Sequence, residues 1–149
     1  MATVKADFAG LNRVKAELRP EIARAVYAAA DIIAADAAVS ITNGSISGAG
    51  HVPSAPGEPP NADTRQLDTS IAVVLDAPNL TANVVAQAPY AAALEYGTRK
   101  MAARPFLRPA LIRNQEAAEA LIARAVTSAL KRSGLLARAG AAFDRIFRR

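Results

Sequence analysis

Apolar residues in the N-terminal third of the chain recur at the spacing of an α-helix. One stripe repeats every three or four positions and comprises Ile22, Val26, Ala29, Ile33 and Ala37. A shorter apolar stripe precedes Pro20. Proline fits the first turn of a helix, where its missing N–H is not needed, so Pro20 most simply begins a helix near Arg19. Residues 8–41 therefore predict one helix or two, the longer one making the core contact.

The middle of the chain contains two runs rich in β-branched residues, 70–75 and 80–86. The four residues between them combine aspartate, proline and asparagine, which is typical of a turn. This order predicts an antiparallel hairpin. A short alanine-rich helix is expected next over residues 90–96, and Gly97 follows it as a C-terminal stop.

The C-terminal third predicts an extended segment followed by a long helix. Residues 98–107 should be extended because Arg104 and Arg108 each precede a proline, and a residue in that position avoids the helical region. Pro109 then suits the first turn of a helix that runs from residue 110 to about residue 132.

Residues 43–63, between the first helical region and the hairpin, are rich in glycine and proline. They hold four glycines and four prolines in 21 residues, which excludes a helix or a central strand. We expect either an extended arm that reaches a neighbouring subunit or a plain flexible loop.

These elements predict a single α+β domain over residues 1–149. Its order is an N-terminal helix, a long Gly/Pro loop, a small antiparallel β-sheet, a short helix and a long C-terminal helix. Residues 135–149 form a basic amphipathic tail, expected to be a last helix that packs on the domain or on a neighbour.

Composition narrows the classes of function. Of 149 residues, 52% are apolar, but 37 are alanine and none is tryptophan, so we expect burial to be completed against partners. The chain has no cysteine and one histidine, His51, and it lacks phosphate-binding and nucleophile motifs. Glu95 is a lone carboxylate, expected to pair with an arginine or to lie on a helix surface. We therefore expect no enzyme activity, no metal and no cofactor.

No uninterrupted run of 18 apolar residues and no signal-peptide core occurs, so we expect no membrane partner and a cytoplasm-like compartment. Charge is uneven. Residues 1–103 carry 8 basic and 10 acidic side chains, whereas residues 104–149 carry 10 basic and 3 acidic ones. The basic third indicates an acidic or phosphate-bearing partner, or simply a solvated helix face.

Three stretches together resemble a known family. They read PGEPPNADTRQLDTSI from Pro56, YA followed by EYGT from Tyr90, and RPFLRPAL from Arg104. Their order and spacing are similar to those of the gene-product-ten family of HK-97-like tailed phages, the neck or tail-completion proteins, to which the lambda minor tail protein Z is similar in role. One departure is that Thr64 is followed by Arg65, where the family usually has glycine, which puts a tight turn there in doubt.

The resemblance implies a structural virion protein, assembled in the host cytoplasm, that joins a ring at the head-proximal end of the tail. Its partners would be further copies in a homo-oligomer, expected to be hexameric, the tail terminator, head-closure or connector proteins, and packaged double-stranded DNA through non-specific contact. Alternatives are a tail terminator, a head-closure ring protein or a small basic DNA-binding protein. The expected interface residues are Pro56, Gly57, Glu58, Pro59, Pro60, Tyr90, Glu95, Tyr96, Gly97, Thr98, Arg104, Pro105, Phe106 and Arg108.

Two of these residues, Tyr96 and Phe106, are expected to be buried anchors of an interface; the alternative for Phe106 is that it fills the domain's own core. Four basic residues would face a DNA channel or an acidic neighbouring ring: Arg124, Lys131, Arg132 and Arg138.

Overall fold

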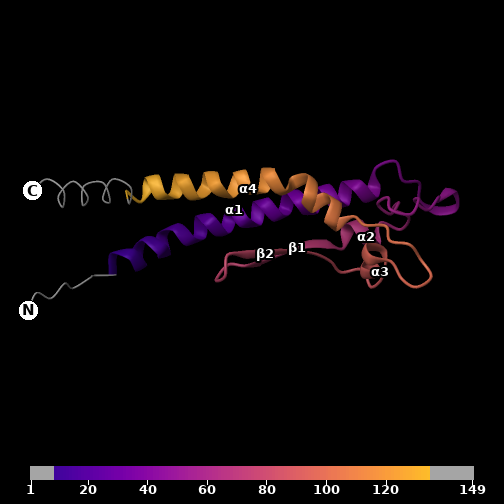
Figure 1. The fold of residues 1–149 in the computed structure, drawn as a ribbon, viewed down its shortest axis with the longest axis horizontal. Helices are drawn as coiled ribbons and strands as arrows, with labels where there is room; N and C mark the ends of the chain where they lie inside the picture. The colour runs from indigo at the N-terminus through magenta and orange to yellow at the C-terminus, as the bar shows by residue number, and fades with distance from the viewer. Residues whose placement is uncertain (1–8, 135–149) are drawn as a thin grey trace, which may run out of the picture.

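The structure is a computed structural model that describes residues 9–134, with side chains described from residue 16 onward. The elements in chain order are α1 (Ala9–Thr42), the 3-10 helix η1 (Gly48–Gly50), α2 (Gln66–Thr69), β1 (Ile71–Asp76), β2 (Thr81–Ala86), α3 (Ala91–Tyr96) and α4 (Leu107–Arg132). This content confirms the α+β class. In Figure 1, α1 and α4 run antiparallel along the long axis, and the hairpin lies along the other side of α1. The expected tail helix of residues 135–149 lies outside the described residues.

Helix α1 is one continuous helix, so the prediction that Pro20 begins a helix is wrong. A proline inside a helix costs about 3 kcal/mol because it removes a hydrogen bond and crowds the preceding turn. The packing of α1 against α4, both strands and α2 offsets this cost, and two exposed polar contacts flank Pro20. Arg19 donates to the carbonyl of Pro78 in the hairpin turn, and Glu21 pairs with Arg132 near the end of α4.

The core is built mainly from alanine. Helix α1 buries alanines along much of its length, and α4 buries Ala110, Ala118 and Ala129. Small side chains let helix backbones approach closely, although each contributes little buried area. Larger apolar side chains gather at one end, where Ile41 and Phe106 are both fully buried.

The hairpin is antiparallel as predicted, with Cα partners running from Ile71↔Ala86 to Asp76↔Thr81. Its four-residue turn is closed by the N–H of Asn79 donating to the Asp76 carbonyl at 3.2 Å. Both strands pack along α1, which supplies the support that an isolated two-stranded sheet lacks.

By length and composition alone, the part of α1 from Ala16 to Thr42 is long and apolar enough to cross a membrane. Core helices of soluble proteins pass the same test. Here α1 packs against α4, both strands and α2, and Asp31 and Asp36 interrupt its apolar sequence. The expectation of no membrane partner stays a prediction.

Candidate functional site

The three motif stretches meet at one end of the domain. The N–H of Gly57 donates to the carbonyl of Ala103 at 2.9 Å, and Arg104 Nε donates to the carbonyl of Ser54 at 3.1 Å. The backbone N–H of Arg104 donates to the carbonyl of Leu94 at 2.7 Å. Residues 54–62, 90–98 and 103–110, separated in the sequence, therefore form one unit, named here the motif junction.

Glu95 is the polar centre of the motif junction. It lies at the end of α3 and is only 8% exposed. Its carboxylate accepts hydrogen bonds from the backbone N–H groups of Phe106, Leu107 and Arg108 at 2.8, 3.0 and 2.9 Å. The expectation of a surface charge or an arginine pair for Glu95 is therefore wrong. The carboxylate caps α4, satisfying N–H groups that have no partner within the helix and placing negative charge at its positive end.

This cap also explains why α4 begins earlier than predicted. The sequence pattern placed the helix start at Pro109, but α4 begins at Leu107. With Glu95 accepting the first N–H groups, the first turn is satisfied before the proline. Pro109 still lies within the first turn, where its missing N–H has no cost.

Gly97 ends α3 as predicted, in a conformation that only glycine adopts readily. Its φ is 76° and its ψ is 179°. A Cβ at this position would lie 2.9 Å from both the Ala103 nitrogen and the Met101 oxygen. Just beyond it, the N–H of Thr98 donates to the Met101 carbonyl at 2.8 Å, so residues 98–101 form a tight turn. Gly97 thus lets the chain fold back against the motif junction.

The two aromatic residues expected at an interface have different surroundings. Phe106 is fully buried in the core, so its role as an interface anchor is wrong and the alternative, core filling, is confirmed. Tyr96 is 72% exposed, and the guanidinium carbon of Arg108 lies 5.9 Å from its ring centroid, within cation–π range. Beside them a shallow hollow of about 420 Å³ is lined also by Pro105 and Ile112. We call Tyr96, Pro105, Arg108 and Ile112 the Tyr96 surface.

The sequence left residues 43–63 as either an extended arm or a plain flexible loop, and the structure ties much of this segment to its own domain. Its second half is tied to its own domain, since the N–H of Ala62 donates to the Ile41 carbonyl at 2.9 Å and Ser54 and Pro60 are buried. Its first half, residues 43–52, is largely exposed and projects beyond the end of α1 (Figure 1). This first half is held to the base of the loop, where the N–H of Gly48 donates to Asp63 Oδ1 at 2.8 Å, and an arm function for it stays a prediction.

The other motif residues vary in exposure. Pro56, Gly57, Glu58, Tyr90 and Thr98 are exposed, whereas Pro59, Arg104 and Pro105 are partly buried. The exposed members are available to a partner, and the partly buried ones support the motif junction.

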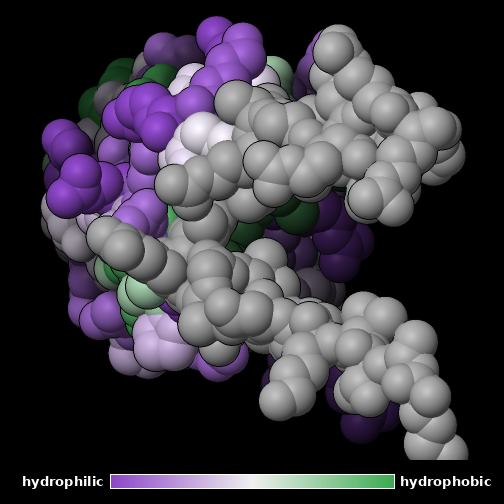
Figure 2. Space-filling model, turned by 90° about the vertical axis from the view of Figure 1, so that its left-hand side faces the viewer, coloured by the Kyte–Doolittle hydropathy of each residue, from purple (hydrophilic) through white to green (hydrophobic). Residues whose placement is uncertain are grey.

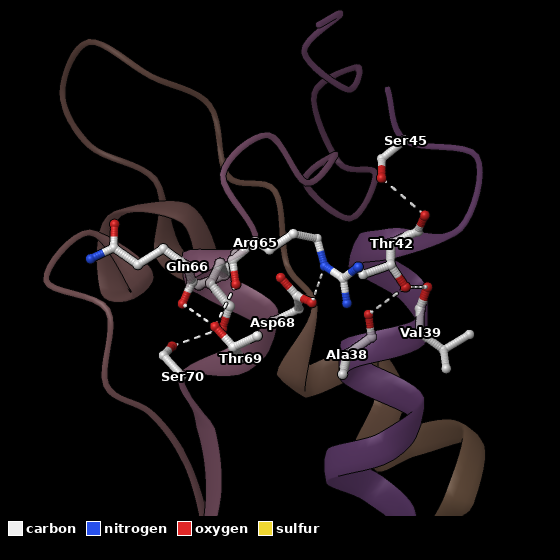
Figure 3. Close-up of polar contacts among 10 residues, drawn as sticks. Ala38, Val39, Thr42, Ser45, Arg65, Gln66, Asp68, Thr69 and Ser70 are labelled. Atoms are coloured by element: carbon white, nitrogen blue, oxygen red, sulfur yellow. Dashed lines mark hydrogen bonds and ion pairs between the residues drawn. The ribbon is translucent and has the colours of Figure 1, made fainter. Parts of the chain in front are cut away.

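Arg65 adopts the left-handed conformation, with a φ of 63°. The tight turn is therefore kept at the position where the family usually has glycine. Its side chain reaches back to Asp68, with Arg65 Nε 2.7 Å from Asp68 Oδ2 (Figure 3). The Asp68 side chain is 4% exposed. No sequence motif pointed to Asp68, although the spacing of three residues between Arg65 and Asp68 is that of an ion pair on one helix turn.

A groove of about 550 Å³ lies beside this turn, lined by residues that include His51, Ser54, Asp68 and Arg104. Ser54 Oγ and Asp68 Oδ1 are buried there without a hydrogen-bond partner among the described residues. His51 Nδ1 lies 3.1 Å from the carbonyl of Ile46, so its ring contacts loop backbone. Within residues 9–134, no cluster of three or more metal-ligating side chains occurs.

Three of the four basic residues expected to face DNA lie away from the motif junction, on the second half of α4. Arg124 and Lys131 are exposed and seven residues apart, which places them on one face two turns apart. Arg132 pairs with Glu21, and Arg138 lies outside the described residues.

No protein-family model matches the chain, and neither a curated protein nor a solved structure matches it. The resemblance to the gene-product-ten family therefore depends on the three motif stretches alone.

Proposed function

We propose that the chain is a structural virion protein of a tailed bacteriophage, a tail-completion protein that forms a ring in the neck, at the head-proximal end of the tail. The order and spacing of the three motif stretches support this function. Their convergence into one motif junction supports it further, because three stretches that recur together in a family are expected to serve one structural unit.

The Tyr96 surface is the observation that carries the proposal. Glu95 and Gly97, which flank Tyr96, are held by hydrogen bonds and close packing, so the exposed ring is presented from a rigid support. Tyrosine and arginine are enriched among the residues that dominate interface energies. An exposed Tyr–Arg pair beside proline and isoleucine is a composition suited to docking a protein partner.

The first experiment deletes the reading frame from its parent phage and images the lysate by negative-stain electron microscopy. The expected result is separate full heads and normal-length tails, with joining restored when the protein is supplied in trans. Intact infectious virions would overturn the proposal. Tails of uncontrolled length would indicate a tail terminator, and heads that lose their DNA would indicate a head-closure protein.

A DNA-binding function is a second candidate because Arg124 and Lys131 share an exposed face of a chain with net charge +5. It predicts that the purified chain binds duplex DNA with an affinity that falls steeply as salt is added. Binding that is absent at low salt would exclude it.

A further inference from the structure

An apolar groove of about 540 Å³ runs between the hairpin and the two long helices. Its floor is α1, from Val26 to Ile33, and one wall is α4, which contributes Leu111 and Ile122. The other wall is β2. Figure 2, which looks along the long axis, shows hydrophobic atoms inside a recess of the described part of the molecule, with hydrophilic and some hydrophobic atoms around it.

The β2 wall of this groove is a strand edge and not a sheet face. Three consecutive residues line it, Ala82, Asn83 and Val84, although successive side chains of a strand point to opposite faces. No β1 residue lines the groove. A peptide segment bound in the groove would therefore lie beside β2, in the position of a third strand.

The backbone groups along this edge point into the groove. The N–H of Gln87 donates to the Ser70 carbonyl at 3.1 Å, in register with the β1–β2 ladder. Hydrogen-bonded and non-hydrogen-bonded residue pairs alternate along an antiparallel ladder. Because Ser70 and Gln87 form a hydrogen-bonded pair, the pairs 72–85, 74–83 and 76–81 are hydrogen-bonded as well. The N–H and C=O groups of Ala82, Val84 and Ala86 therefore point away from β1. They offer backbone hydrogen bonds to an added strand.

The chain itself contains a segment suited to this position, residues 2–8, which lie outside the described residues. Their sequence, ATVKADF, alternates strictly between apolar and polar residues. In a strand, the apolar set Ala2, Val4, Ala6 and Phe8 would share one face. Seven strand residues span about 23 Å, and the six residues of β2 span about 20 Å, so the lengths match.

The same copy cannot place this segment in its own groove. Ala9 begins α1, and Val26, at the near end of the groove, lies 17 residues along the helix, about 26 Å away. Residue 2 lies at most about 25 Å from Ala9, even in a fully extended chain. The segment would therefore stop at the near end, while the groove floor continues to Ile33.

We propose that residues 2–8 of one copy add as a third strand to the β2 edge of another copy, with their apolar face on α1. The donor segment and the acceptor groove are different parts of the same chain, so each copy gives one strand to a neighbour and receives one from another. Such head-to-tail contacts close into a ring or continue as a filament. The proposal deepens the proposed function by naming the contact between copies, and it can hold or fail independently of a place in a virion.

Cross-linking tests the contact directly, since the chain contains no cysteine. The full-length double variant Lys5→Cys/Asn83→Cys places both thiols on the solvent side of the expected third strand. A short bis-maleimide should convert it into a ladder of covalent multimers. The control Lys5→Cys/Thr127→Cys carries its second thiol on an exposed position of α4 and should stay monomeric on the same gel. The proposal would be overturned if the two double variants gave the same ladder of multimers, or if neither variant gave one.

A second measurement keeps the proposal falsifiable if the cysteine variants fold poorly. Val4→Asp puts a carboxylate on the apolar face of the segment, whereas Thr3→Asp puts one on the polar face. Light scattering should show monomers for Val4→Asp and assembled wild-type and Thr3→Asp proteins. In the assembled proteins, hydrogen exchange at the amides of Ala82 and Val84 should slow by about tenfold or more relative to Val4→Asp.

The amides of Ile71 and Val73, on the opposite edge of the hairpin, serve as the internal control and should not change. A wild-type chain that is monomeric at its highest soluble concentration would overturn the proposal, as would assembly that survives Val4→Asp. Assembly without strand donation would leave the proposed function standing. If the chain donates its strand but its deletion leaves intact infectious virions, the proposed function is overturned and the strand contact stands.

Discussion

The carboxylate of Glu95 accepts a hydrogen bond from the backbone N–H of Phe106 at 2.8 Å, joining the end of α3 to the start of α4. The two residues are 11 positions apart, and the turn that Gly97 begins lies between them. The bond connects the second and third motif stretches, and Phe106 at its other end fills the core. One buried carboxylate thus fixes the start of α4 and also the backbone next to the exposed Tyr96.

Replacing Glu95 with Gln should destabilise the protein. The amide nitrogen would point a donor at N–H groups that need an acceptor, and the negative charge at the start of α4 would be lost. The expected loss in free energy of unfolding is about 1–3 kcal/mol, measured by urea denaturation followed by circular dichroism. Glu119→Gln, on an exposed face of the same helix, should change it by less than about 0.5 kcal/mol. Equal effects would contradict the capping role.

Gly97→Ala should cost more than an alanine at another left-handed glycine. Gly57 has a φ of 87° and no atom within 4 Å of a built Cβ, so Gly57→Ala reports backbone strain alone, about 1 kcal/mol. At Gly97 the Cβ also meets two backbone atoms at 2.9 Å, which cannot move aside cheaply. We expect a loss of about 3 kcal/mol or more in the same denaturation assay. Matching losses for the two variants would show that the turn relaxes.

Phe106→Ala and Tyr96→Ala should separate folding from assembly. Phe106 is fully buried, so its truncation should lower the free energy of unfolding by about 3–5 kcal/mol. Tyr96 is 72% exposed, so its truncation should change stability by less than about 0.5 kcal/mol and yet fail to restore head–tail joining in the deletion phage. Tyr27→Ala, on an exposed part of α1, is the matched control and should restore joining. Restored joining by Tyr96→Ala would remove the Tyr96 surface from the proposed interface.

Arg65→Gly should have opposite effects in two backgrounds. Glycine relieves the left-handed strain at this position, worth about 1 kcal/mol, but removes the ion-pair partner of the buried Asp68. With Asp68 present we expect a net loss of stability, and in an Asp68→Asn background a net gain. A double-mutant cycle by thermal or urea denaturation should give a coupling of about 1–2 kcal/mol. Additive effects would mean that the ion pair contributes nothing.

Local sequence pattern was sufficient for the elements whose stability is local. The apolar stripe of α1, the turn chemistry between the strands and Gly97 after α3 all predicted elements that the structure contains within one or two residues. Periodicity reports which face of a segment is apolar, and turn residues report where the backbone reverses. The start of α4 was misplaced because its cap comes from Glu95, 12 residues before the helix begins.

The sequence by itself determined the α+β class and the order and approximate bounds of the longer elements, whereas the short helices η1 and α2 were not predicted. Only the tertiary structure decided that Glu95 caps α4, that Phe106 fills the core, that Pro20 lies inside a continuous α1 and that residues 54–62 pack on their own domain. Each of these depends on contacts between residues distant in the chain. At these residues burial and hydrogen bonding depend on which distant segments pack together, and a local sequence pattern does not contain that information.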